Sequence, residues 1–249
     1  MFIIFITILF LIVLVFLIYK NKKRNHSIFQ TKTDLDKIAH INMSCKVLKR
    51  VMRPDLGAGI FVNIVEDSCY DGLPHTTDKI NINIPLSLYE KGGNDLDHVL
   101  EHECIHIMQR RDIYAWKQMY ARFKWAIYSK IPFSDMNEEL ISLLKRVREN
   151  PDISNEKYGI WNKRYLFLSC YKNVYNPKVR ESEMIIYDLY EKKVLKGFPP
   201  DYYDWMKINQ ADHPHEIFAE LLSDKEKYSQ LNYGVQNFFN LQKKKLFVD

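Results

Sequence analysis

The sequence predicts an α+β fold that is mainly helical and is preceded by an N-terminal transmembrane helix. Three observations predict it: an apolar run at the N-terminus, two segments rich in β-branched residues between positions 60 and 86, and helical spacing of apolar residues over most of the chain after position 94. A length of 249 residues suits one medium domain with an appendage. We therefore expect a transmembrane anchor at 1–19, a basic juxtamembrane tether at 20–34 and a folded domain at 35–249.

The first predicted element is the unbroken apolar run at 2–19. As a helix rising ~1.5 Å per residue it would reach roughly 27 Å, close to the ~30 Å thickness of the hydrocarbon layer. A cleaved signal peptide is the alternative, but no positive charge precedes the run and no small-residue cleavage site follows it. Because the basic residues lie on its C-terminal flank, we expect a single-pass membrane protein whose C-terminal domain is cytoplasmic.

The charge distribution argues against a nucleic-acid partner. The formal net charge is +5, but Lys20, Lys22, Lys23 and Arg24 account for most of it, with no acidic residue among them. The rest of the chain is nearly neutral and has no basic stripe interleaved with aromatic residues. We expect no nucleic-acid binding, and an alternative role for the basic cluster is to hold anionic lipid.

The cysteines and the overall composition bear on the compartment. Cys45, Cys69, Cys104 and Cys170 are widely separated and form no CxxC pair, which is typical of a reducing compartment. Ile, Lys, Asn and Tyr are plentiful, as in an AT-rich genome such as that of a large DNA virus, in which case the membrane would be that of the virion. The sequence does not indicate an oligomeric state.

The elements of the domain follow from local patterns. Residues 38–53 mix apolar and basic side chains at roughly helical spacing, whereas 60–65 and 80–85 are dominated by β-branched residues and predict strands. Asn94 or Asp95 can cap a helix that ends near position 111. The remaining predictions are a helix over 113–129, a helix from 134 or 135 to 149, either structure at 165–171 and 183–194, and a helix from about Pro214.

The motif that indicates chemistry is H-E-x-x-H at 102–106, on the helix that ends near position 111. His102 and His106 are four residues apart on one helix face, so two imidazole nitrogens can converge on one ion such as zinc. Glu103 is about 100° further around the helix, where a carboxylate can take a proton from water without coordinating the ion. An accidental match on an amphipathic helix is the alternative for a pattern this short.

A catalytic zinc also needs a third protein ligand, and E-I-F-A-E at 216–220 offers one on a later helix. Together the two motifs resemble the gluzincin branch of the zincin-type zinc metallopeptidases, and E-x-F-A-E is similar to the form found in lethal-factor-type toxin peptidases. The resemblance implies a zincin-like metallopeptidase domain at 35–249. In it His102, His106 and Glu216 would bind Zn²⁺, Glu103 would be the general base and Glu220 would orient an imidazole.

The resemblance also implies an activity, which is zinc-dependent hydrolysis of peptide bonds in a peptide or protein substrate by a membrane-anchored enzyme. In zinc peptidases an edge strand beside the site helix holds an extended substrate, and the strand-like segment at 80–86 would have that role here. The alternative is a catalytically inactive zincin-like protein that is anchored in a membrane and serves as a structural or adaptor protein.

The third metal ligand has an alternative assignment. His106 and Glu216 are 110 positions apart, which is longer than the family's usual separation, so the helices between them must form an insertion or the third ligand must be nearer. Glu138 and Glu139 are the nearer candidates. No acidic residue follows either of them by four positions, so we favour Glu216.

Other polar residues near the motifs have weaker cases. His98 extends the histidine row by one turn, but it would lie ~12 Å along the axis from His106, so we expect it at the surface or behind a ligand. Gln109 is expected to be solvated, with a place in the cleft as the alternative.

Peptide hydrolysis needs a donor for the developing oxyanion. Four residues that precede Glu216 in the sequence are candidates for this hydrogen-bond donor: His215, His213, Tyr202 and Tyr203. For each of them a purely structural role is the alternative.

Overall fold

The computed structural model describes residues 35, 36, 39, 45–132, 136–153, 155–208 and 211–248. All of them belong to the compact unit Thr33–Asp249. The predicted anchor at 1–19 and tether at 20–34 lie outside the described residues. Within the described ranges, no helix is both long and apolar enough to cross a membrane. This finding corrects the predicted single-pass topology and the membrane and cytoplasmic location derived from it, and neither is retained.

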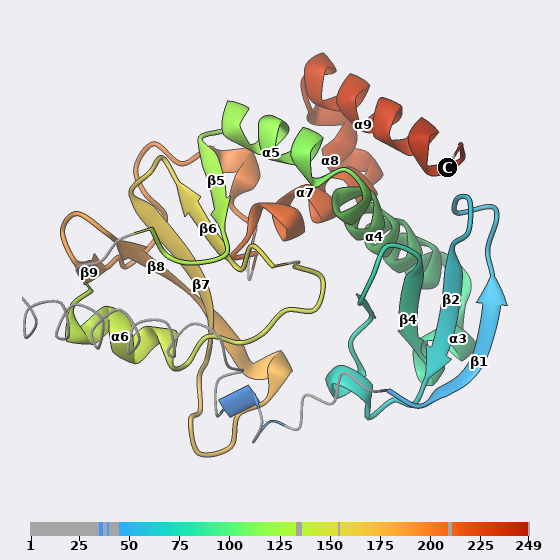
Figure 1. The fold of residues 1–249 in the computed structure, drawn as a ribbon, viewed down its shortest axis with the longest axis horizontal. Helices are drawn as coiled ribbons and strands as arrows, with labels where there is room; N and C mark the ends of the chain where they lie inside the picture. Colours follow the sequence, from blue (N-terminus) through green and yellow to red (C-terminus); the bar gives the residue numbers. More distant parts are fainter. Residues whose placement is uncertain are drawn as a thin grey trace, which may run out of the picture. The chain divides into compact units, whose positions relative to one another are not determined.

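Residues between 47 and 85 form a mixed sheet in the order β1-β2-β4-β3. Its strands are β1 (Val47–Met52), β2 (Phe61–Val65), β3 (His75–Thr76) and β4 (Asn81–Pro85). β2 and β4 are parallel and the other neighbours are antiparallel (Figure 1). The predicted strands at 60–65 and 80–85 are confirmed. β4 pairs on both sides, however, so it is not an edge strand; the edge strands of this sheet are β1 and the short β3.

The helix predicted over 38–53 is wrong for residues 47–52, which form β1. Nearly all of this strand is exposed, and Lys49 and Arg50 stand in its middle. Charged residues on an edge strand keep it from pairing with other chains. They also spread the apolar residues of β1 at intervals that resemble helical spacing, which explains the error.

Three helices follow the first sheet: α3 (Leu86–Lys91), α4 (Gly93–Arg111) and α5 (Ile113–Arg122). The predicted helix ending near position 111 is confirmed as α4. Gly92 and Gly93 both have positive φ, 59° and 70°, and so allow the sharp turn between α3 and α4. α4 packs against β3 and β4 and, more extensively, against α7 (Pro214–Ser223).

A second sheet occupies much of the chain between the two motifs. It is antiparallel throughout, in sequence order (Figure 1). Its strands are β5 (Trp125–Tyr128), β6 (Tyr158–Trp161), β7 (Tyr165–Tyr171), β8 (Ser182–Asp188) and β9 (Lys193–Val194). The prediction of a mainly helical α+β domain with a transmembrane helix is therefore wrong, because the described part contains two sheets and no membrane-spanning helix.

The helix predicted over 113–129 ends at Arg122 for a local reason. Lys124 adopts a left-handed conformation with φ of 64°, which terminates the helix, and the next four residues form β5. Trp125 is fully buried and packs against Phe167 on β7. Aromatic residues favour strands as well as apolar helix faces, so their spacing alone did not separate the two structures.

The other helices follow the second sheet or interrupt it. The α-helices are α6 (Glu138–Leu144), α7, α8 (Lys225–Gln230) and α9 (Tyr233–Leu246), and the 3₁₀ helices are η1 (Cys69–Gly72), η2 (Val179–Glu181) and η3 (Asp204–Met206). The helix predicted from about Pro214 is confirmed. α6 stops before the predicted 149, because Arg146 and Arg148 instead exchange backbone hydrogen bonds with β7.

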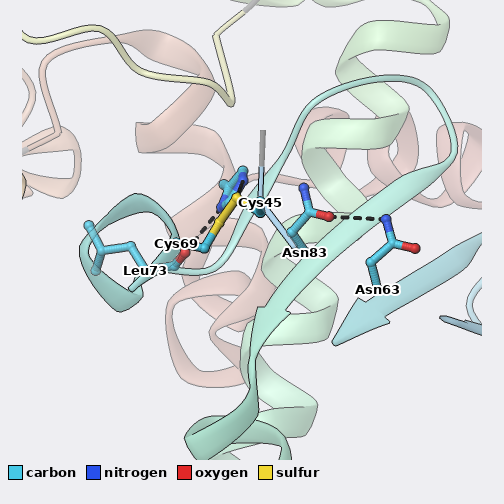
Figure 2. Close-up of a disulfide and its surroundings, with 6 residues drawn as sticks. Cys45, Asn63, Cys69, Leu73 and Asn83 are labelled. Atoms are coloured by element: carbon cyan, nitrogen blue, oxygen red, sulfur yellow. Dashed lines mark hydrogen bonds between the residues drawn. A yellow bond between two sulfur atoms is a disulfide. The ribbon is translucent and has the colours of Figure 1, made fainter. Parts of the chain in front are cut away.

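Two cysteines form a disulfide that the sequence spacing did not suggest. Cys45, just before β1, is bonded to Cys69 in η1 (Figure 2). Cys104 and Cys170 are buried free thiols. The ring of His75 lies beside the disulfide, with Nε2 4.0 Å from Cys45 Sγ. The cysteine usage expected for a reducing compartment is thus incorrect for this pair.

Removing this disulfide is expected to lower the free energy of unfolding by about 3 kcal/mol, because a crosslink across some two dozen residues restricts the unfolded chain. Urea denaturation of the oxidised protein and of a Cys45→Ser/Cys69→Ser variant measures the difference. A thiol reductant should shift the wild-type midpoint to that of the double variant and leave the double variant unchanged. Four reactive thiols in the unfolded, unreduced protein would contradict the pairing.

Candidate metal centre

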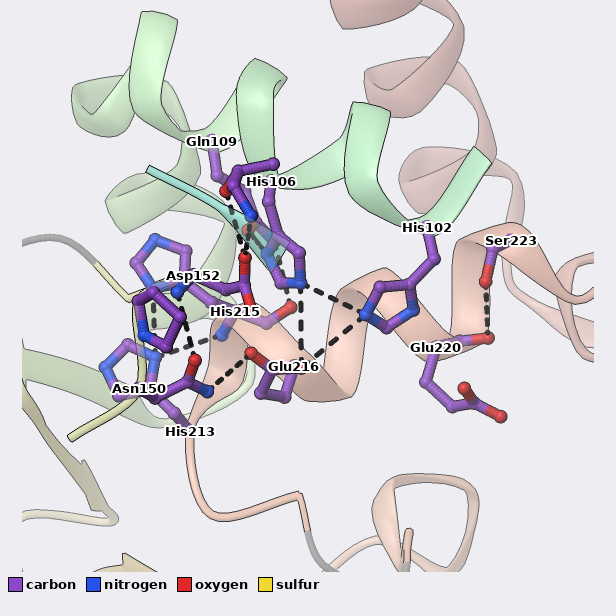
Figure 3. Close-up of polar contacts among 12 residues, drawn as sticks. His102, His106, Gln109, Asn150, Asp152, His213, His215, Glu216, Glu220 and Ser223 are labelled. Carbon is purple, nitrogen blue, oxygen red and sulfur yellow. Dashed lines mark hydrogen bonds and ion pairs between the residues drawn. The ribbon is translucent and has the colours of Figure 1, made fainter. Parts of the chain in front are cut away.

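α4 and α7 bring three potential ligands to one point. The Nε2 atoms of His102 and His106, one turn apart on α4, lie 3.1 Å from each other (Figure 3). The Oε2 atom of Glu216, in the first turn of α7, lies 3.6 Å from each of these nitrogens. Among the described residues this trio is one of the groups whose geometry could hold a metal ion. The structure thus unites the three residues singled out as ligands in the sequence.

The first turn of α7 is held in place by the second sheet. His213 caps the helix and Pro214 occupies its first turn, where proline is well tolerated. Just before the cap, Asp212 Oδ2 accepts a hydrogen bond from the backbone N–H of Ser169 on β7, at 3.0 Å. Gly159 on β6 permits the close approach, because a Cβ there would lie 3.0 Å from Pro214 Cδ. These contacts determine where Glu216 is presented.

Gln109 orients one imidazole and links the two helices. His106 Nδ1 lies 2.8 Å from Gln109 Oε1, and because an amide oxygen can only accept, His106 donates from Nδ1. The Gln109 amide group in turn donates to the backbone oxygen of His215, at 2.9 Å. Because Nδ1 is engaged by Gln109, Nε2 is the ring nitrogen that faces Glu216 and is available to an ion, the arrangement that metal-binding histidines usually have. Gln109 is fully buried, so the expectation that it is solvated is wrong.

Asn150 holds the carboxylate of Glu216. Its Nδ2 donates to Glu216 Oε1 at 2.8 Å, which leaves Oε2 facing the imidazoles (Figure 3). Asn150 Oδ1 accepts from the backbone N–H of Asp152 at 3.0 Å, which fixes the orientation of the amide. The sequence analysis assigned no role to Asn150, which directly follows the helix predicted to end at position 149.

The Glu103 carboxyl group lies beside the ligands without belonging to the trio. It is buried, and its Oε2 atom has no hydrogen-bond partner among the described residues. Burial, assisted by the charge of Asp152, raises the pKa of Glu103 well above its usual range. A carboxylate that is poorly solvated in this way is a stronger proton acceptor than an exposed one.

The charges at the site favour a bound cation. Burial lowers the pKa of His106, but Glu216, Asp152 and Glu103 together outweigh burial and raise this pKa to about 10. Burial raises the pKa of Glu216, but His106 and His102 together outweigh burial and lower this pKa well below its usual range. Two imidazoles that face a carboxylate thus attract positive charge, which a proton or a metal ion can provide.

The site opens into a cleft with a volume of about 1250 Å³. His102 and Glu216 line it together with Glu103, so two of the three members of the trio face the cleft, while His106 is fully buried. His98 is exposed and lines the same cleft, but it belongs to none of the possible metal-binding groups of the described residues. This agrees with the expectation that it does not coordinate the ion.

Glu220 and the two nearer acidic candidates do not join the site. The Glu220 carboxylate accepts a hydrogen bond from Lys227 Nζ at 2.6 Å, and the structure does not bring it to an imidazole, contrary to the role implied by the resemblance (Figure 3). Glu138 and Glu139 are exposed in the first turn of α6. Neither belongs to a possible metal-binding group of the described residues.

The proposed oxyanion donors are also not brought to the cleft. His215 is buried behind the first turn of α7, where its ring stacks on His213. Burial lowers the pKa of His213 to about 3 and that of His215 well below its usual value, so both rings are neutral. Tyr202 is buried among aromatic side chains, and Tyr203 packs against Trp205. None of these four candidates lines the cleft.

Two further groups in the described part have a geometry that could hold a metal ion. One consists of Glu103, His106 and Asp152 and overlaps the first trio. The other consists of Cys45, Cys69 and His75, but there the two sulfur atoms are bonded to each other. The cysteine group therefore does not offer three independent ligands, whereas the two groups that share His106 do, and each of these has two members in the wall of the cleft.

Comparison of the chain with models of known protein families, with curated proteins and with solved structures gave no match. The likeness to gluzincins accordingly consists of two short motifs. A proposal about function therefore depends on the chemistry that these side chains can perform where the fold holds them.

Replacing Gln109 by Leu is expected to weaken metal binding by about 10- to 100-fold, because His106 loses the acceptor that orients its ring. The same change leaves the backbone oxygen of His215 without its donor, which should cost about 1–3 kcal/mol of stability. Metal affinity is measured by competition with a chromophoric chelator, and stability by urea denaturation. Gln118→Leu, at an exposed position on α5, is the matched control. Equal affinities in the two variants would exclude the orienting role.

Proposed function

We propose that the protein is a zinc metallopeptidase that hydrolyses peptide bonds in a peptide or protein substrate. The observation that carries the proposal is the convergence of His102, His106 and Glu216 beside the Glu103 carboxyl group, at the wall of an open cleft. The gluzincin-like motifs that supply these four residues support the same conclusion.

The donor set suits zinc in a catalytic rather than a structural setting. Structural zinc sites are usually closed by four protein ligands, whereas catalytic sites combine three with an open position. Two imidazoles and one carboxylate form such a set here, and access from the cleft leaves room for water or substrate. Gln109 and Asn150 hold two of the three ligands in the required orientation.

Each side chain then has a defined task. Bound zinc would supply a Lewis acid for the scissile carbonyl and lower the pKa of water. Glu103 accepts a proton from the attacking water and returns it to the leaving amine. Its poor solvation favours the first of these steps, because burial makes the carboxylate a stronger proton acceptor. The cleft positions the peptide beside this carboxylate.

Glu103→Gln is expected to retain zinc and to lower peptide hydrolysis by about 10²–10⁴-fold or more, because proton transfer is lost while the ligands are kept. His102→Ala and His106→Ala should lose both zinc and activity. Elemental analysis of the full chain, which should contain about one zinc per chain, and digestion of a peptide library measure the two properties. Glu101→Gln, one residue before the motif and paired with Lys243, is the control and should keep both.

The outcomes separate the proposal from its main alternative. Equal zinc loss in all three variants would show that the role of Glu103 is wrong. Stoichiometric zinc without hydrolysis of any peptide would instead favour an inactive zincin-like structural or adaptor protein. A wild-type chain without bound zinc would contradict the metal centre itself.

A further inference from the structure

Arg148 is a cationic side chain in the wall of the same cleft as Glu216 and Glu103. Within the described residues no carboxylate lies within ion-pair distance of its guanidinium, although the charges of Asp212 and Glu216 act on it from further away. Its Nε atom is buried and has no hydrogen-bond partner there. The proposed hydrolysis assigns no task to this residue.

The backbone of Arg148 is rigidly placed beside the second sheet. Its N–H donates to the backbone oxygen of Ser169 at 2.8 Å, and the neighbouring Val147 forms a β-bridge with Cys170. Arg146, two positions earlier, pairs with Glu183 and does not line the cleft. The two arginines thus share one extended segment, and only Arg148 is directed to the site.

The Tyr70 hydroxyl group binds one terminal nitrogen of the Arg148 side chain. Arg148 Nη1 donates to the Tyr70 hydroxyl oxygen at 2.8 Å, and that hydroxyl donates to the backbone oxygen of Glu149 at 2.9 Å. The edge formed by Nε and Nη2 makes no hydrogen bond within the described residues. Elsewhere in this chain the same edge of an arginine holds a carboxylate, in Arg164–Asp188 and in Arg53–Asp55.

Other cationic side chains that line the cleft are already engaged. Lys227 pairs with Glu220 and Asp224, and Lys207 pairs with Asp204. Arg180 donates to the backbone oxygens of Asp71 and Gly72. Arg148 therefore differs from its neighbours, since burial of a cation with an unmet donor is unfavourable unless a counter-ion binds.

We propose that the Arg148 guanidinium binds a carboxylate of the substrate, held in place for this by Tyr70. The inference rests on the proposed peptidase function and adds a substrate class to it: peptides that present a free C-terminus, or an acidic side chain, to the cleft. A carboxylate fits better than a phosphate, because one guanidinium balances a single negative charge while Glu103, Asp152 and Glu216 would repel a dianion. A planar guanidinium edge also matches the two oxygens of a carboxylate.

Three versions of one peptide test the proposal and identify the source of the carboxylate. The first has a free C-terminus and no acidic side chain, the second is amidated, and the third is amidated but carries one glutamate. Wild-type protein should cleave the first or the third at least about tenfold more efficiently than the second, through a lower KM. Arg148→Gln should remove that preference, Arg148→Lys should retain part of it, and Arg146→Gln, the matched control, should retain all of it.

Other results overturn the carboxylate site. If Arg148→Gln lowers kcat/KM equally on all three peptides, the residue supports the fold or the oxyanion and does not read a carboxylate. If wild-type protein cleaves the amidated and acidic peptides equally well, no such selectivity exists.

A binding measurement separates this inference from the peptidase proposal. Calorimetry with zinc-loaded Glu103→Gln should show tighter binding of the acidic peptides than of the amidated peptide, and the difference should vanish in Glu103→Gln/Arg148→Gln. If wild-type protein cleaves nothing but this difference is found, the carboxylate site is supported and the peptidase function is wrong. If the acidic and amidated peptides bind equally, or none binds, the carboxylate site is wrong.

Discussion

The packing of α4 against α7 is the constraint on which the candidate site depends, and a single buried amide spans it. Gln109 accepts from His106 on its own helix and donates to the backbone of His215 on the other. Because both of these bonds are buried, moving one helix relative to the other would leave polar groups unsatisfied in a low-dielectric interior. The side chain that orients the imidazole thus also fixes the distance at which α7 presents Glu216, so ligand orientation and helix packing are coupled.

The second sheet acts on the site from the opposite side. The backbone oxygen of Ser169 on β7 accepts a hydrogen bond from the N–H of Arg148, and the N–H of Ser169 donates to the carboxylate of Asp212. The segment that carries Asn150 and the residue just before α7 are thus bonded to the same strand. These two attachments bring Asn150 and Glu216 together. The chain between the two motifs is therefore part of the site's construction, since it supplies the strand to which both segments are bonded.

The sequence predicted those features that depend on residues within one segment of the chain. The four-residue spacing of His102 and His106 placed both imidazoles on one helix face, and β-branched residues marked β2 and β4, because each depends on periodicity within one segment. The choice of Glu216 came from a likeness between motifs. By contrast, the second sheet and the role of Asn150 depend on pairing between segments far apart in the chain. Gln109 was misjudged because its burial is decided by α7, which periodicity on α4 does not report.

Negative and positive side chains occupy separate parts of the cleft. Acidic groups gather at the α4–α7 contact, where Glu103, Asp152 and Glu216 lie close to His106 and together raise its pKa. Arg148 provides a second, separate positive charge on the wall, held by Tyr70 rather than by an acid. If the proposed function holds, a neutral peptide would gain little from this pattern, whereas a peptide with a carboxylate would have its anionic end attracted to the arginine and repelled by the acidic cluster. The carbonyl group of the neighbouring peptide bond would then be the part of the substrate that faces the candidate metal centre, so electrostatic orientation would precede the chemical step.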